Sequence, residues 1–380
     1  GNERPSHPSF AHGGDHTSPT TNPLSLRGHR VRYRAPVLGL RIVSCLVFFA
    51  AGCGASAAID GGMDARADVD TGPRDSGSDA GPLPACGTGS PEALMSCVEA
   101  SRYVADLETI AAPRESGSTH HGEVRELCAA RLEALGFTIE RHDYGTGVNI
   151  VGTLTGTTLP DEHVLISAHY DSTFDCPGAD DNATGVAGAL ETARVLAMRG
   201  HDRTLIVACW DEEEQGLVGS TQYADRANAA GDVIVANFVY EMIGYRDTTP
   251  GTQTFPPGFD VLFAREVRSL EERGSPADFI AFIADELHSA ATAALLEAMA
   301  TRVGLPSIAI VANETLKLSP LTADLRRSDH GPFWENDDPG IMITDTSNFR
   351  YDRYHCGAGP AVVAGLDHAF SVAVIEATVG

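Results

Sequence analysis

The chain has 380 residues, 43% of them hydrophobic, so it can bury a substantial core and is not disordered throughout. It carries 52 acidic against 27 basic residues, which gives a formal net charge of −25. Because nucleic-acid binding relies on clustered Lys and Arg that neutralise phosphates, this balance argues against a nucleic-acid partner.

Residues 1–53 have the pattern of a leader with a lipoprotein-type signal peptide. Residues 1–36 are rich in Pro, Ser, His and Gly and show no apolar periodicity. Basic residues then precede an apolar run at 42–51, which is too short to span a bilayer as a helix but suits the core of a signal peptide. The run ends in Ala-Ala-Gly-Cys, which resembles a bacterial lipobox. We therefore expect an exported protein, secreted or held on the cell envelope, whose only membrane attachment is a lipid anchor on Cys53.

Residues 54–85 predict a disordered acidic linker, because they consist mainly of Gly, Ala, Asp, Ser and Pro and contain no aromatic residue. The predicted catalytic domain spans 86–380. Cys86 and Cys97 are close enough in sequence to form the easiest disulfide of an exported chain, while the connectivity of the other cysteines stays open. Cys209 lies inside an apolar strand pattern, so we expect a buried free thiol there.

From residue 86 onward, helical and strand-like patterns alternate. Apolar spacing predicts helices at 90–110, 122–135, from 182 or 184 to 198, 289–303 and 366–379. Short apolar runs predict strands at 137–144, 148–154, 164–168, 205–210, 233–240, 307–312 and 341–344. This alternation predicts an α/β fold, a three-layer α/β/α sandwich with a central mixed, mostly parallel sheet.

Side chains that bind metals or protons gather directly after the predicted strands or at a helix start: His169, Asp171, Asp181, Glu213, Glu214 and Glu241. On an extended chain His169 and Asp171 point the same way, so the carboxylate can orient the imidazole or share its metal. A single His-x-Asp pair or acidic run is usually structural. Four such clusters at strand ends, where sites form in open α/β sheets, predict one functional site.

The segments that carry these residues follow a recognisable order: HYD (169–171), GADDNATG (178–185), EEEQGLVGS (212–220), EMIGY (241–245), SDHGPFW (328–334) and YH (354–355). This order resembles the di-zinc aminopeptidase family that includes aminopeptidase Y and secreted bacterial leucyl aminopeptidases. The resemblance covers about residues 86–380. It implies a zinc-dependent exopeptidase that acts on peptides with a free N-terminus.

The resemblance also implies roles for individual residues. Two zinc ions are expected, bound by the following residues: His169, Asp181, Glu214, Glu241 and His355. Asp181 is expected to bridge the two ions, and its peptide bond to Asn182 is expected to have an unusual, cis geometry. Glu213 is the expected general base, although Glu212 with Glu213 is an alternative register for the glutamate pair.

Two histidines compete for the last ligand position. The resemblance favours His355, with His330 as a neighbour in the pocket, and His330 would take the position if His355 lay elsewhere. In the family an Asp-Thr pair usually follows a few positions after this histidine. Here Cys356-Gly357-Ala358 follows instead. The surroundings of that zinc ion therefore depart from the family pattern, which can lower metal affinity.

Two zinc ions that share a carboxylate polarise a bound water and the scissile carbonyl, and a general base adds typically about 10²- to 10⁴-fold in rate. Glutaminyl cyclase is one alternative of the same fold, but only four residues separate Glu214 from Gly219-Ser220, and the intact DNATG at 181–185 is peptidase-like. A carboxypeptidase or dipeptidase is a second alternative. A lipid-anchored binding domain that has lost catalysis is disfavoured, because all the candidate ligands and Glu213 are present.

Overall fold

The structure is a computed structural model that describes residues 82–380. The predicted leader, the lipid anchor at Cys53 and nearly all of the predicted linker lie outside the described residues. The described part contains one eight-stranded sheet with the order β1-β2-β4-β3-β5-β8-β6-β7. Its strands are β1 (Thr138–Asp143), β2 (Val148–Leu154), β3 (Leu159–His169), β4 (Arg203–Trp210), β5 (Val233–Glu241), β6 (Ile280–Asp285), β7 (Ser307–Ala312) and β8 (Ile341–Thr344).

The sheet is mixed, as predicted. Four neighbouring pairs are parallel, namely β4–β3, β3–β5, β5–β8 and β6–β7. The pairs β1–β2, β2–β4 and β8–β6 are antiparallel. Because β3, β4, β5 and β8 run in one direction, their carboxyl ends lie at one edge of the sheet, and the carboxyl ends of β6 and β7 lie at the opposite edge.

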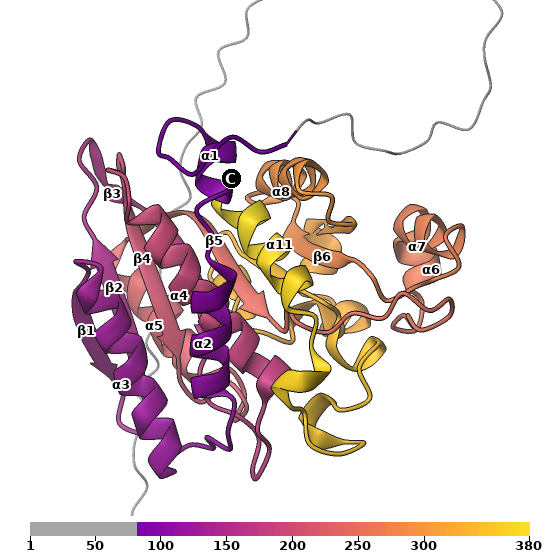
Figure 1. Cartoon of the computed structure of the whole chain (residues 1–380), viewed down its shortest axis with the longest axis horizontal. Coiled ribbons are helices and arrows are strands. Elements are labelled where there is room, and N and C mark those ends of the chain that lie inside the picture. The colour runs from indigo at the N-terminus through magenta and orange to yellow at the C-terminus, as the bar shows by residue number, and fades with distance from the viewer. Residues whose placement is uncertain (1–81) are drawn as a thin grey trace, which may run out of the picture. The chain divides into compact units, whose positions relative to one another are not determined.

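Helices cover both faces of the sheet, and several of them lie side by side over the front face in Figure 1. The helices are α1 (Pro91–Met95), α2 (Ala100–Ile110), α3 (Thr119–Ala134), α4 (Gly185–Leu196), α5 (Val218–Ala230), α6 (Phe259–Leu262), α7 (Ala264–Glu271), α8 (Ala290–Arg302), α9 (Glu314–Lys317), α10 (Gly331–Glu335) and α11 (His368–Val379). Short helical turns occur at η1 (Ala179–Thr184), η2 (Pro320–Arg326), η3 (Ser347–Phe349), η4 (Tyr354–Cys356) and η5 (Val363–Gly365).

Alternating side chains of the central strands pack into different cores on the two faces. Ile166 and Val207 belong to the largest core, together with buried residues of α1 to α4, α8 and α11. Leu165 and Ile206 belong to a core on the other face that includes Tyr223 of α5. A further core joins α6 and α7 to β6, β7 and β8. This three-layer arrangement confirms the predicted fold class.

Several element boundaries differ from the sequence prediction. The helix predicted at 90–110 is two helices, α1 and α2, and the strand predicted at 164–168 begins earlier, at Leu159. The strand β6 was not predicted, although its buried apolar run is of the same kind as those of β4 and β8, which were predicted. In residues 82–380 we find no helix with the length and apolar character needed to cross a bilayer.

Three disulfides join the six cysteines of the described part: Cys86–Cys97, Cys128–Cys209 and Cys176–Cys356. The first confirms the predicted pair. The prediction that Cys209 is a free thiol is wrong, because Cys128 on α3 lies against β4 and bonds to it. An apolar strand pattern shows that a cysteine is buried, but it does not show whether a covering helix supplies a partner.

Candidate metal centre

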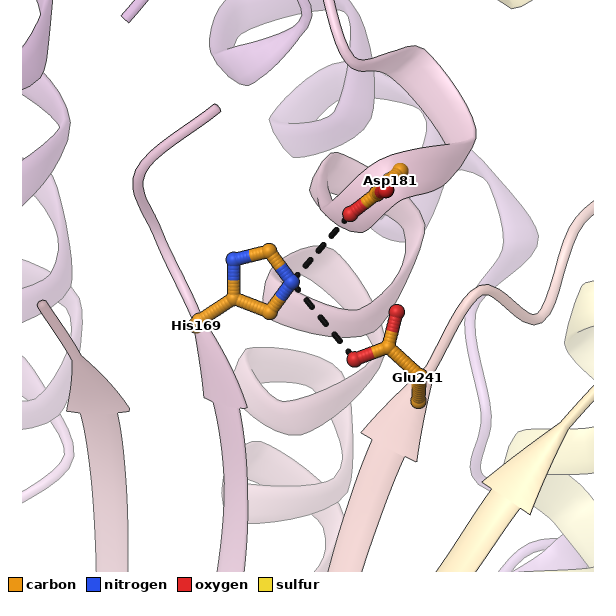
Figure 2. Close-up of side chains that lie close together, drawn as sticks. All are labelled: His169, Asp181 and Glu241. Atoms are coloured by element: carbon orange, nitrogen blue, oxygen red, sulfur yellow. Dashed lines mark ion pairs between the residues drawn. The ribbon is translucent and has the colours of Figure 1, made fainter. Parts of the chain in front are cut away.

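Three predicted ligands meet at the carboxyl ends of two central strands. His169 ends β3, Glu241 ends β5, and Asp181 comes from η1, which leads into α4 (Figure 2). The imidazole Nε2 of His169 lies 3.2 Å from Oδ1 of Asp181 and 3.5 Å from Oε2 of Glu241. All three side chains are buried.

A second group shares Asp181 with the first. Nε2 of His355 lies 3.2 Å from Oδ2 of Asp181 and 3.1 Å from Oε2 of Glu214. In each group one ligand atom per residue lies within 4.8 Å of the others. Asp181 therefore turns one carboxylate oxygen to each group, which is the arrangement of a bridging ligand. The peptide bond from Asp181 to Asn182 is cis, as expected from the sequence.

The spacing of these atoms fits two metal ions. Ligand atoms bound about 2.0–2.1 Å from a tetrahedral zinc ion are about 3.4 Å apart. The four contacts measure 3.1 to 3.5 Å, yet Nε2 of His169 and the buried Oε1 of Glu214 have no hydrogen-bond partner among the described residues. Buried polar atoms without partners are rare in proteins, and a cation between them would satisfy them. Zinc in proteins is bound by imidazole nitrogens and carboxylate oxygens, among other ligands.

The electrostatics of the cluster point the same way. Burial raises the pKa of Glu213 well above its usual value, and the carboxylate of Glu241 adds to the shift. Burial and then Asp181 raise the pKa of Glu214 to about 7. Burial opposes the ionisation of Asp181, but the neighbouring imidazoles of His169 and His355 outweigh it and lower the pKa of Asp181. Carboxylates so crowded repel one another, and bound cations would remove that repulsion.

Asp171 connects the end of β3 to the loop that carries Glu213 and Glu214. Its Oδ1 accepts a hydrogen bond from the backbone N–H of Glu213 and its Oδ2 accepts one from that of Glu214, both at 3.1 Å. Oδ1 also lies 3.3 Å from Nδ1 of His169. Asp171 therefore holds a candidate ligand and the predicted base in fixed relation to each other, and it does so from outside the metal groups.

The three consecutive glutamates have different surroundings. Oε2 of Glu213 lies 3.9 Å from Nε2 of His169, so this carboxylate faces the first metal group. The carboxylate of Glu214 belongs to the second group. Glu212 points elsewhere, since its Oε2 accepts a hydrogen bond from the Thr146 hydroxyl at 2.7 Å. The geometry thus favours the Glu213-Glu214 register over the alternative pair.

The SDH segment contributes to the site, but not through its histidine. The Ser328 hydroxyl donates a 2.7 Å hydrogen bond to Oε2 of Glu241. Asp329 is fully buried and close enough to influence Glu213 and His169. Burial raises the pKa of Asp329 to about 7. Sequence reasoning missed Asp329, although it lies directly before the histidine that was singled out.

His330 lies apart from both metal groups, contrary to the expectation that it neighbours them in the pocket. Its Nε2 is 2.6 Å from the carbonyl oxygen of Leu325, and its ring meets Trp334 edge to face. Its Cβ adjoins Gly340, which precedes β8, whereas the metal groups lie beyond the other end of the parallel strands. Burial lowers the pKa of His330 to about 4, so the ring is neutral.

An apolar pocket opens beside the metal groups. It encloses about 660 Å³, its open mouth included, and Glu241 and Tyr354 contribute to its lining. Much of the remaining wall is apolar, including Phe255, Phe259, Phe279, Ile308 and Met342. The pocket places an apolar surface next to the candidate ligands.

Residues 149–359, more than half of the chain, match peptidase family M28. The chain belongs to this family. Membership confirms the predicted metallopeptidase class. A probable zinc metalloprotease of Leptosphaeria maculans is 29% identical to this chain over 226 residues, which cover 54% of this chain and 48% of that protein. The uncharacterized protein YfbL of Escherichia coli is 32% identical over 205 residues, covering 50% and 58%. The chain thus spans about half the length of the curated relatives it matches.

Two solved enzyme structures have the same fold as this chain. The LapA aminopeptidase of Legionella pneumophila superposes with a TM-score of 0.56 at 16% identity, covering 76% of this chain and 72% of that one. A glutaminyl cyclase of Porphyromonas gingivalis gives 0.51 at 17% identity, covering 74% and 97%. Fold alone therefore does not separate a peptidase from a cyclase.

Proposed function

We propose that this M28 family member is a zinc aminopeptidase that removes N-terminal residues from peptides. Two zinc ions are bound in this proposal, one by His169, Asp181 and Glu241 and the other by Asp181, Glu214 and His355. The observation that carries the proposal is the pair of ligand groups sharing Asp181, with the Glu213 carboxylate beside them. An acidic cluster without a catalytic role has no reason to combine these features.

Bound zinc would supply Lewis acidity, which lowers the pKa of a coordinated water and polarises the scissile carbonyl. The chain supplies the proton transfer. Oε2 of Glu213 would take a proton from the attacking water and return it to the leaving amine nitrogen. Burial raises the pKa of Glu213, and a raised carboxyl pKa suits a group that must both accept and donate a proton near neutral pH.

Two features favour aminopeptidase action over the alternatives. The carboxylates around the metal groups attract the positively charged N-terminal amine of a peptide. The apolar pocket beside Glu241 can take the side chain of the N-terminal residue, so we expect apolar residues to be preferred.

The test is hydrolysis by the purified chain before and after chelation, and again after zinc is restored. Leucine and phenylalanine amides should be cleaved, N-acetylated forms of the same amides should not, and activity should return with zinc. Turnover of N-blocked peptides from their C-terminus would instead identify a carboxypeptidase. Conversion of N-terminal glutamine to pyroglutamate without hydrolysis would identify a cyclase.

We also propose that the domain is exported and anchored through lipid on Cys53, as the signal pattern predicts. Three disulfides in the described domain suit an oxidising compartment. Replacement of the anchor cysteine, Cys53→Ala, should move the protein from the membrane fraction to the soluble fraction. An unchanged distribution would reject the anchor.

A further inference from the structure

The Cys176–Cys356 disulfide joins two loops that flank the second metal group. Cys356 is the residue directly after His355. Cys176 lies in the loop at residues 172–178, between β3 and the turn that carries Asp181. A covalent bond therefore connects the residue after His355 to the loop that leads to Asp181.

The loop at 172–178 is held by hydrogen bonds to the buried side chain of Arg114. Arg114 is fully buried, and its guanidinium donates hydrogen bonds of 2.8, 2.6 and 2.9 Å to three backbone carbonyls: Tyr170, Pro177 and Gly178. The Ser172 hydroxyl accepts a hydrogen bond from the backbone N–H of Arg114 at 3.0 Å and donates one to the backbone carbonyl of Cys176 at 3.1 Å. Cys176 is thus a fixed point to which another segment can be tied.

The segment that carries His355 has much weaker local support. His355 and Cys356 both have left-handed backbones, with φ of 50° and 59°, which cost roughly 1–2 kcal/mol each in a residue other than glycine. The backbone N–H groups of Cys356 and Gly357 each bond only three residues back, to the carbonyls of Arg353 and Tyr354. The His355 side chain is 39% exposed.

Tyr354 gives the ring one support of its own. The two rings stack with centroids 3.7 Å apart, and the Tyr354 hydroxyl accepts a 3.0 Å hydrogen bond from Arg327. Stacking restrains the plane of the imidazole but does not act on the backbone of the segment. The disulfide acts directly on that backbone.

Two ligands of the first metal group are held by the sheet and not by a disulfide. His169 and Glu241 end β3 and β5, which are hydrogen-bonded neighbours in the centre of the sheet, and the His169 side chain is fully buried. The two groups share Asp181 but differ in how their histidines are held. Loss of the disulfide should therefore affect one group and spare the other.

We propose that the Cys176–Cys356 disulfide positions His355 and so sets the metal affinity of the Asp181, Glu214 and His355 group. The inference rests on the proposed two-zinc function. It also accounts for the sequence after His355, where the expected Asp-Thr pair is absent and Cys356 occurs instead. In this chain a covalent tie to the loop held by Arg114 takes over the task of orienting the ligand.

The test compares two double variants of the full chain at a series of buffered free zinc concentrations, with bound zinc counted per chain. Cys176→Ala/Cys356→Ala removes the tie and leaves no thiol that could bind zinc. Cys86→Ala/Cys97→Ala removes a disulfide near α1 and serves as the control. The wild type and the control should bind two ions. The test variant should bind one ion normally and the second about 10- to 100-fold more weakly.

The His355→Ala variant shows whether the effect passes through that ligand. It should lose the same ion, and adding Cys176→Ala/Cys356→Ala to it should cause no further loss of zinc. A general loosening of the fold would instead weaken the remaining site as well. Undiminished affinity for both ions in the disulfide variant overturns the inference but leaves the proposed function standing, whereas a wild type that binds fewer than two ions overturns the proposed function.

If the test variant does not fold, the folded control variant can be reduced with a water-soluble phosphine. The phosphine takes oxygen from water and becomes the oxide, while each sulfur of the disulfide gains a hydrogen. Cys128 and Cys209 are fully buried, whereas Cys356 is only partly buried, so Cys176–Cys356 is the more accessible of the two bonds. Both thiols are then blocked with iodoacetamide. Weaker binding of one ion supports the inference, and two tightly held ions refute it.

Discussion

Oε2 of Glu213 lies 3.9 Å from Nε2 of His169, whereas the carboxylate of the next residue, Glu214, contacts His355 instead. Because Glu213 is not one of the proposed ligands, we expect the Glu213→Gln variant to fold and to keep both zinc ions. Because the amide cannot accept the proton of the attacking water, turnover should fall by about 10²- to 10⁴-fold. Zinc counting together with kcat measures this, and an active Glu213→Gln enzyme would remove the proposed base.

Glu214→Ala should behave differently, because this carboxylate lies 3.1 Å from His355 in the second metal group. We expect one zinc ion to be lost. The melting temperature should also fall, since a metal that binds only the folded state stabilises it. Glu212→Ala is the matched control, because Glu212 bonds to Thr146 and not to the cluster. A Glu212 variant that loses zinc while the Glu214 variant keeps it would reverse the register.

Asp171→Asn tests the residue that holds the loop and the strand end together. The amide keeps the shape but turns an N–H₂ toward one of the backbone N–H groups of Glu213 and Glu214, so one donor is left unpaired. We expect about 1–3 kcal/mol lower unfolding free energy and about 10- to 100-fold lower metal affinity. Urea unfolding and zinc titration check both. Normal affinity would show that Asp171 does not support the metal groups.

His330→Phe should leave both the zinc count and the turnover unchanged. The ring contacts Trp334, and its Nε2 is 2.6 Å from the Leu325 carbonyl, so the expected loss is stability of about 1–3 kcal/mol from the unpaired carbonyl. Thermal unfolding and zinc analysis separate these outcomes. Loss of a zinc ion would return His330 to the ligand set in place of His355.

The sequence predicted the strands that position the site, because His169, Glu214 and Glu241 follow short apolar runs with clear ends. The run at 341–344 is β8 without a change of boundary, and that at 148–154 is β2. The strand β6 was missed, although Asp278 and Asp285 bound its apolar run. The convergence of His169, Asp181 and Glu241 follows from strand direction, while His355 came from the family resemblance, since its loop has no regular period.

Two features of the site could not be predicted from the sequence. Six cysteines allow 15 pairings, and only the fold brings Cys176 to Cys356. The direction of His330 depends on the start of α10, where consecutive residues project differently. Asp329 is close enough to His169 to feel its charge, whereas the Cβ of His330 adjoins Gly340, before β8. The role of the five converging residues as ligands stays a prediction for metal analysis.

Removal of zinc should make stability depend on pH in a defined direction. Burial raises the pKa of Glu214 from its usual 4.5 to about 7 and that of Asp329 from 3.8 to about 7. The folded, metal-free protein thus holds protons that the unfolded chain has released. The stabilisation from these groups is fully present below about pH 4 and is lost as pH rises through about 7.

The metal-free protein should therefore lose unfolding free energy between pH 5 and pH 7, by at most about 1.4 kcal/mol per pH unit for each group. The zinc-bound protein should not follow this course, because bound cations favour the ionised carboxylates. Asp329→Asn removes one of the two titrating groups. The unfolding free energy of the metal-free variant should therefore fall less steeply with pH, by the contribution of Asp329. Urea unfolding at pH 5, 6, 7 and 8 with and without zinc measures this. A metal-free protein as stable at pH 7 as at pH 5 would show that ionising these buried carboxylates does not destabilise the fold, and that zinc has no such repulsion to remove.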